Sequence, residues 1–248
     1  MTYRSAVIFD MDGVLVDVRE SYVYAALNTV RTLTKFSAYT SQDFHRIKGW
    51  GGFNNDWDLT LALIWLLGEG TTTQDSAPRT QDSLRRAVLQ DSPFRRQWSE
   101  KVKHVFQQFY LGVAHYERIY GKVAEVVLPN DLGFIAREKP WIPADFIHRL
   151  PRNVYRVLLT GRPRPEAEIT MDLLGLRSAF HVTVTDTESL ELAQKFKLSE
   201  HAFRKPSTLL AKWLDAQLTT GVRCLVYWGD NRDDLRVSRS FDKPCQLF

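Results

Sequence analysis

The sequence predicts an α/β protein in which a Rossmann-like parallel sheet is interrupted by an all-helical insert. Four short runs rich in β-branched and aromatic residues are each followed by polar residues or glycine, which is typical of buried parallel strands. Helical patterns lie between the last three runs, as expected of βαβ units. The first two runs are about 145 residues apart, far more than one crossover connection needs, so this stretch predicts a second domain.

The predicted core contains all four strands and the helices that connect the last three. The strands are residues 5–9, 154–159, 181–185 and 224–228, and the helices are residues 165–176 and 206–218. Each helical pattern begins with proline and has glycine near its end, the usual asymmetry of helix termini. We therefore assign residues 1–17 and 141–248 to the α/β core.

The predicted insert, residues 18–140, shows helical periodicity instead of strands. Apolar residues at spacings of three and four predict one long helix over residues 102–120. Residues 57–67 predict a second, very apolar helix. Residues 68–83 are rich in Gly, Thr, Ser, Asp and Gln and predict a mobile surface loop.

Acidic residues mark two helix starts in the insert. Asp17 is expected to cap a helix over residues 22–30, with Glu20 completing a capping box. Asp56 is expected to cap the helix that begins at Trp57.

Composition limits the class of protein. The 248 residues include 33 Lys and Arg against 29 Asp and Glu, a net charge of +4 with both signs interspersed, so we expect no nucleic-acid binding. Only Cys224 and Cys245 are present, and the six histidines show no metal-ligand spacing. The most apolar run, residues 59–68, is too short to span a bilayer. We expect a soluble cytoplasmic protein, monomeric or homodimeric, that does not bind membranes.

The residues that suggest chemistry lie at the ends of predicted strands or, in one case, just before a helix. They are Asp10 and Asp12 after the first strand, Thr160, Gly161 and Arg162 after the second, Asp230, Asp233 and Asp234 after the fourth, and Lys205 before a helix. Ligands of open α/β sheets bind beyond the carboxyl ends of the strands, so we expect these residues to converge. Five carboxylates at one edge would repel one another unless a cation held them. Mg²⁺ is the natural candidate, because it takes oxygen ligands and bridges carboxylates to phosphate.

In this order the motifs resemble those of the haloacid dehalogenase superfamily of phosphoryl-transfer enzymes. The first motif, DxDG(T/V), matches residues 10–14, and the second matches Thr160 in LLTGR. The third matches Lys205 in RKP, and the fourth, GDxxxD, matches Asp230 and Asp234. The insert resembles the helical C1 cap of subfamily I, whose members include phosphoglycolate-phosphatase-like proteins and uncharacterised capped phosphatases.

The resemblance implies a role for each of the first catalytic residues. Asp10 would be the nucleophile, because a carboxylate needs no base to attack phosphorus. Asp12 would protonate the leaving alkoxide and later take a proton from water. The Thr160 hydroxyl and the Gly161 amide would hold phosphate oxygens, with Arg162 as a further substrate-binding residue.

The resemblance also implies how charge is balanced. Lys205 would offset the negative charge of the nucleophile and the phosphoryl group. The Mg²⁺ ligands would be Asp10, Asp230, Asp234 and the backbone carbonyl of Asp12. Asp233 has two readings of equal weight: a metal contact, or an acid near the positive end of a helix dipole.

The most unusual stretch of the insert, KGWGGFNNDWDLT, spans residues 48–60. It resembles a stretch in a subgroup of capped phosphatases, some of which are fused to histidine-biosynthesis enzymes. Within this stretch Asn54 and Asn55 are candidates to hydrogen-bond the leaving group, with Lys48 or Trp50 helping. The plainer alternative is that Asp56 caps a helix and the glycines turn the chain.

These features favour a Mg²⁺-dependent phosphatase that hydrolyses a small phosphorylated metabolite through an aspartyl-phosphate. A phosphomutase that passes the phosphoryl group to another sugar hydroxyl would use the same motifs. A binding or regulatory protein that has lost turnover is a third hypothesis, and the presence of every catalytic side chain argues against it.

Overall fold

The computed structural model describes residues 3–50, 52–53, 55–75, 77–128, 131–218, 222–230 and 232–248. The chain divides into two compact units. The first comprises Met1–Asp17 and Lys139–Phe248, and the second comprises Val18–Glu138. Among the described helices, none combines the length and apolar character that crossing a membrane requires.

A parallel sheet forms the centre of the first unit, with strand order β5-β4-β1-β6-β7 among the described residues. Its strands are β1 (Ser5–Phe9), β4 (Val154–Leu159), β5 (Val182–Val184), β6 (Cys224–Trp228) and β7 (Cys245–Leu247). The central strand β1 pairs in parallel with β4 on one side and β6 on the other. The four predicted strands are confirmed, and β7 is an addition at the edge.

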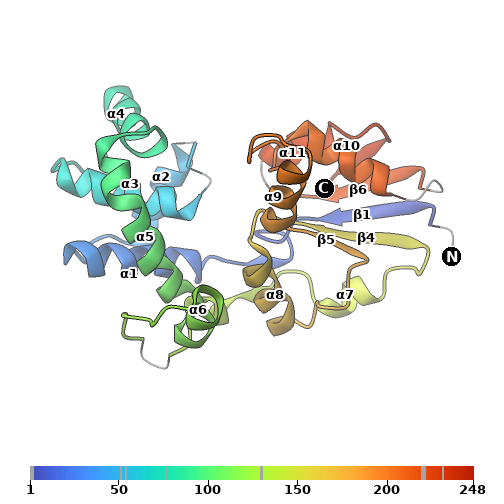
Figure 1. Ribbon diagram of the computed structural model, residues 1–248, viewed down its shortest axis with the longest axis horizontal. Helices are drawn as coiled ribbons and strands as arrows, with labels where there is room; N and C mark the ends of the chain where they lie inside the picture. The colour runs from blue at the N-terminus through green and yellow to red at the C-terminus, as the bar shows by residue number, and fades with distance from the viewer. Residues whose placement is uncertain are drawn as a thin grey trace. The chain divides into compact units, whose positions relative to one another are not determined.

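Helices cover both faces of this sheet (Figure 1). They are α7 (Ala144–His148), α8 (Arg164–Leu173), α9 (Asp186–Lys195), α10 (Thr208–Gln217) and α11 (Arg232–Ser238). One core joins Ile8 and Tyr227 of the sheet to Leu192, Leu214 and Val237 of α9, α10 and α11. The helices α7 and α8 lie on the opposite face, as right-handed crossovers require. The predicted α/β fold is confirmed.

The chain leaves and re-enters the first unit through a short antiparallel pair. Strand β2 (Val16–Asp17) pairs with β3 (Lys139–Pro140), and Asp17 lies opposite Lys139. The capping role predicted for Asp17 is therefore wrong. The next helix, α1 (Tyr22–Thr34), has Ser21 at its N-cap, so Glu20 precedes the helix and completes no capping box.

The second unit is helical. After α1 it contains α2 (Ser41–Gly49), α3 (Asp56–Gly68), α4 (Pro78–Leu89), α5 (Pro93–Leu111), α6 (Val113–Tyr120) and the 3₁₀ helix η1 (Phe134–Arg137). The helices α1, α3 and α5 pack against one another. The rings of Tyr22 and Tyr110 stack at 4.7 Å, and the Tyr110 hydroxyl donates to Glu138 Oε1 at 3.1 Å. This unit therefore has its own core, built by apolar helix faces.

The single helix predicted over residues 102–120 is wrong, because Gly112 divides it into α5 and α6. Gly112 has a φ of 79°, in the region that favours glycine. A Cβ there would lie 2.3 Å from the backbone nitrogen of Gly133. The regular apolar spacing continues across the break, which is why it suggested one helix.

The predicted loop over residues 68–83 is shorter than expected. The helix α4 begins at Pro78, with proline in its first turn. Thr73 is buried, and it accepts a hydrogen bond from Arg46 Nη1 at 3.0 Å and donates one to Asp43. The polar composition of this segment therefore did not indicate that a helix begins at Pro78 or that Thr73 is buried and hydrogen-bonded.

The cap predicted at Asp56 is also displaced by one residue. Asn55 is the N-cap of α3, and its side-chain oxygen accepts from the backbone N–H groups of Trp57 and Asp58. Asp56 is the first helical residue instead. Asn and Asp are about equally good caps, so their adjacency left the sequence ambiguous.

Candidate active site

Asp10 follows the last residue of β1 at the carboxyl edge of the sheet. Its backbone N–H donates to the carbonyl of Trp228 at 2.9 Å, which ties it to the end of β6. Its side chain is 6% exposed and forms an ion pair with Lys205, with Nζ 2.8 Å from Oδ1. Burial raises the pKa of Asp10 to about 7 despite the nearby ammonium, and the charges of Asp234 and Asp12 add to the increase.

Lys205 lies between two buried carboxylates. Its Nζ donates to Asp234 Oδ1 at 2.6 Å as well as contacting Asp10. Burial alone would lower the pKa of Lys205, but attraction to Asp10, Tyr227 and Asp234 outweighs it and holds the pKa well above its usual range. The ammonium is therefore a fixed positive charge at the centre of the site.

Asp234, in the first turn of α11, is fully buried. Besides Lys205, it accepts from the Tyr227 hydroxyl at 2.9 Å and, through Oδ2, from the backbone N–H of Asp230 at 3.2 Å. Burial raises the pKa of Tyr227 well above its usual value, so its hydroxyl stays a donor. The sequence assigned no role to Tyr227. The sequence feature that could have indicated a role is a tyrosine within a buried strand, since a buried hydroxyl requires a hydrogen-bond partner.

Three carboxylates could hold a metal ion in the described part of the chain. One oxygen each from Asp10, Asp230 and Asp234 lie within 4.8 Å of one another. Asp230 also approaches Gly13 so closely that a Cβ on Gly13 would lie 2.0 Å from Asp230 Oδ2, and Gly13 has a φ of 76°. Only glycine fits both requirements at this position. Three carboxylates are the oxygen donors that Mg²⁺ prefers, so the residues fit this ion.

Asp12 contacts a different cation. Arg162 Nε donates to Asp12 Oδ1 at 2.9 Å, and Nη2 of the same guanidinium donates to the same oxygen. Arg162 Nη1 donates to Thr170 Oγ1 on α8 at 2.6 Å. The Arg162 side chain is 2% exposed, whereas that of Asp12 is 36% exposed.

The loop after β4 carries the predicted phosphate contacts. Thr160 is buried, with its N–H bonded to the Val184 carbonyl at 2.9 Å, and Oγ1 accepts from the backbone N–H of Arg162 at 3.2 Å. Gly161 is exposed, and a Cβ there would meet open space. The amide predicted to hold phosphate is thus on an accessible turn.

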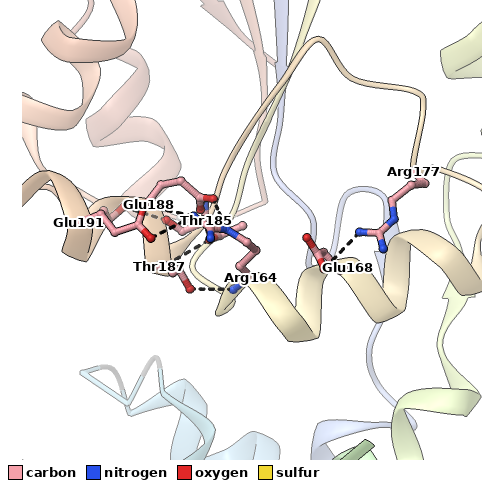
Figure 2. A network of polar contacts seen from close by, with 8 residues as sticks. Arg164, Glu168, Arg177, Thr185, Thr187, Glu188 and Glu191 are labelled. Carbon is pink, nitrogen blue, oxygen red and sulfur yellow. Dashed lines mark hydrogen bonds and ion pairs between the residues drawn. The ribbon is translucent and has the colours of Figure 1, made fainter. Parts of the chain in front are cut away.

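A polar network fixes the helix starts beside this loop (Figure 2). The backbone N–H of Arg164 donates to Thr187 Oγ1 at 2.9 Å, and its Nε donates to Glu188 Oε1 at 2.6 Å. Thr185 and Glu188 form a capping box at the start of α9. The network links the start of α8 to the start of α9.

The remaining predicted residues are one acid next to Asp234, two residues of the second unit and one residue outside the described part of the chain. Asp233 is in the first turn of α11 and forms an ion pair with Arg236 at 3.7 Å. In the second unit, Lys48 is exposed near the end of α2, and Asn55 caps α3. Asn54 lies outside the described residues.

No protein-family model matches the sequence. Over 181 residues the chain is 26% identical to the imidazoleglycerol-phosphate dehydratase of Phytophthora nicotianae. This match covers 72% of the chain and 31% of that protein. The chain therefore spans less than a third of the length of the curated relative it matches.

Solved structures resemble the whole chain. Phosphatase Tt82 from Thermococcus thioreducens superposes with a TM-score of 0.67 at 22% identity, covering 98% of this chain and 92% of that one. A candidate phosphoglycolate phosphatase from Lactobacillus delbrueckii subsp. bulgaricus superposes with a TM-score of 0.54 at 14% identity, covering 100% and 86%. At such identities the likeness shows the fold. The α/β core with a helical insert is thus the fold of these phosphatase structures, and it agrees with the fold that the resemblance implied.

Proposed function

We propose that the chain is a Mg²⁺-dependent phosphatase that hydrolyses small phosphomonoesters through an aspartyl-phosphate on Asp10. The observation that carries this proposal is the cluster of three carboxylates within 4.8 Å, with the Lys205 ammonium bonded to two of them. Carboxylates this close need cationic partners, and the lysine supplies only one positive charge. The set is suited to a divalent cation and a phosphoryl group.

Asp10, Asp230 and Asp234 would hold the metal ion, together with the backbone carbonyl of Asp12. When bound, Mg²⁺ supplies positive charge that offsets the negative charge of the carboxylates and of phosphoryl oxygens. Asp233 is the least supported candidate, because its ion pair is with Arg236.

In the first step, an Asp10 carboxylate oxygen attacks phosphorus and the bond between phosphorus and the leaving oxygen breaks. Asp12 gives its proton to that oxygen as it departs. Lys205 stabilises the negative charge that is shared between Asp10 and the transferred group. The Thr160 hydroxyl and the Gly161 N–H bind phosphoryl oxygens.

In the second step, water attacks the phosphorus of the aspartyl-phosphate. Asp12, now ionised, takes the proton of this water, and the bond between phosphorus and Asp10 oxygen breaks. Orthophosphate leaves, and both acids return to their starting states.

Substrate selection is proposed to involve the insert. Lys48, Asn54 and Asn55 are the candidates for contact with the leaving group, and Asn55 would have to combine this with its capping role. A small phosphorylated metabolite is the expected substrate class. The name of the curated relative refers to imidazoleglycerol phosphate, so a panel of phosphomonoesters should include it.

The test is phosphate release from 4-nitrophenyl phosphate and from the metabolite panel, with and without Mg²⁺. Asp10→Asn should lower kcat at least about 10³-fold, because the nucleophile is lost. Acid quenching of the wild-type enzyme with labelled substrate should trap phosphate on the protein, and Asp10→Asn should trap none. Asp215→Asn is the matched control, since this buried carboxylate pairs with Lys243 at 2.8 Å instead. It should keep its kcat.

Robust turnover by Asp10→Asn would contradict the covalent mechanism. Full activity after removal of divalent ions would contradict the role of Mg²⁺. Trapped phosphate that passes to a second substrate hydroxyl, without net release, would identify a phosphomutase.

A further inference from the structure

The buried guanidinium of Arg162 is held from several directions. Its Nη1 donates to Thr170 Oγ1 at 2.6 Å. Its own backbone N–H donates to Thr160 Oγ1, and its carbonyl accepts from the N–H of Asp186 at 2.9 Å. A side chain that is 2% exposed and bonded in this way has little freedom to change its direction.

Two donors of this guanidinium converge on one oxygen of Asp12. Both Nε and Nη2 donate to Oδ1. A guanidinium has only donors and keeps its charge, so it cannot accept a hydrogen bond from a protonated carboxyl. A proton carried by Asp12 therefore resides on Oδ2, because Oδ1 already faces two N–H groups.

We propose that Arg162 is a positioning residue, which fixes the Asp12 carboxyl so that Oδ2 exchanges the proton with the leaving oxygen and with water. This inference rests on the proposed function and goes beyond it, since Arg162 was expected to bind substrate. A phosphate contact by the same N–H groups would require them to leave Asp12. The Thr170 hydroxyl supports the arrangement from α8.

The leaving group separates this role from phosphate binding. An alkyl phosphate needs a proton on its departing oxygen, whereas 4-nitrophenolate departs without one. Arg162→Lys keeps the charge but loses the planar fork that holds Oδ1. Hydrolysis of the aspartyl-phosphate is common to both substrates and does not enter kcat/KM, so kcat/KM is the quantity to compare. We expect Arg162→Lys to lower kcat/KM about 10²-fold on glycerol phosphate and only a few-fold on 4-nitrophenyl phosphate.

Thr170 provides a gentler pair of variants in case Arg162→Lys folds poorly. Thr170→Val removes the acceptor of Nη1 at nearly constant volume, and Thr170→Ser keeps a hydroxyl. Thr170→Val should show the same selective loss on the alkyl substrate, and Thr170→Ser should lose less. Arg177→Lys is the control for disturbing α8, because Arg177 pairs with Glu168 on that helix (Figure 2). It also pairs with Asp172 of the same helix. The Arg177→Lys variant should leave both rates unchanged.

Equal losses of kcat/KM on the two substrates would overturn the positioning role and identify Arg162 as a phosphate ligand. A selective loss on the alkyl substrate supports it. Failure of the proposed function looks different: the wild-type chain would hydrolyse neither substrate, or Asp10→Asn would remain active. Either result removes the phosphatase and this inference together.

Discussion

The two acids of the first motif are separated by one residue but lie in different environments. Asp10 belongs to the Lys205 side of the site, which we define as Asp10, Lys205, Tyr227 and Asp234. Asp12 belongs to the Arg162 side, which we define as Asp12, Arg162 and Thr170. The Asp10 side chain is 6% exposed and that of Asp12 is 36% exposed.

This difference separates two physical tasks. On the Lys205 side, buried carboxylates share a cation, so the balance of charge decides both stability and reactivity. On the Arg162 side, one guanidinium hydrogen-bonds one oxygen of a partly exposed acid. The main effect of this contact is therefore to fix the orientation of the carboxyl group. Variants of the first side should therefore change stability together with activity, and variants of the second should change mainly the rate.

The largest effect is expected from Lys205→Met, which leaves two buried carboxylates without their cation. Breaking a buried ion pair from one side typically costs about 3 to 5 kcal/mol in the free energy of unfolding. The loss of charge stabilisation should also lower kcat about 10²- to 10³-fold. Urea unfolding and phosphate release measure the two effects.

Lys243→Met is the matched control, because Lys243 forms an ion pair of equal length, 2.8 Å, with the buried Asp215. It should lose stability and keep kcat. If Lys205→Met loses stability but keeps its kcat, as this control should, charge balance on the Lys205 side does not contribute to catalysis. The proposed difference between the two sides would then be wrong.

The next effect is the pH dependence of stability in metal-free protein. Burial raises the pKa of Asp10 to about 7 in the folded state, against 3.8 for an ordinary Asp. Between these values the folded state binds more protons than the unfolded state, so the free energy of unfolding falls as the pH rises. The fall should amount to roughly 2 to 4 kcal/mol between about pH 4 and pH 7 and level off above.

Asp10→Asn carries no proton to lose, so its unfolding free energy should lack this contribution. Urea titrations of both proteins at a series of pH values, in chelator, give the difference curve. A flat difference curve would mean that the Asp10 carboxylate is ionised at no cost in the folded protein. Adding Mg²⁺ at pH 7.5 should stabilise the wild type more than the variant.

The fold followed from the sequence because the core strands are strongly apolar runs that end at polar residues or glycine. Residues 5–9 and 154–159 are the strands β1 and β4 without a shift. The helix α9 was missed, because its exposed face is polar and its start is marked by a capping box, Thr185 with Glu188, instead of proline. The strand β7 has three residues, too few to show a pattern.

The helix bounds predicted for the insert were wrong where a local backbone feature interrupts the apolar spacing. At Gly112 the close approach of another backbone interrupts a regular apolar stripe, and no sequence spacing records that approach. At Asn55 and Asp56 two good capping residues are adjacent, so the choice depends on where the chain turns. The substrate contacts expected of Lys48, Asn54 and Asn55 stay predictions for the same reason: they depend on orientation.

Within the site, motif order indicated which segments meet, but not the pairing of side chains. The spacing of residues 10–14 and 230–234 says nothing about which carboxylate takes Lys205. Tyr227 and Thr170 lie in apolar stretches where a hydroxyl looks like ordinary packing. Long-range partners become visible only when the strands bring their ends together.

The smallest effect is expected from removing the hydrogen bond that Tyr227 donates to Asp234. This change tests whether that bond contributes to metal binding. Tyr227→Phe removes one of the donors to the buried Asp234 carboxylate and should cost about 1.5 kcal/mol in the free energy of unfolding. Because this hydroxyl orients a proposed ligand, the Mg²⁺ dissociation constant measured by calorimetry should rise about tenfold. Tyr116→Phe, which removes a buried hydroxyl bonded to His104 in the second unit, should lose stability with unchanged Mg²⁺ affinity. Equal Mg²⁺ affinities in wild type and Tyr227→Phe would mean that Tyr227 contributes to stability alone. The Lys205 side would then end at Asp234 and exclude Tyr227.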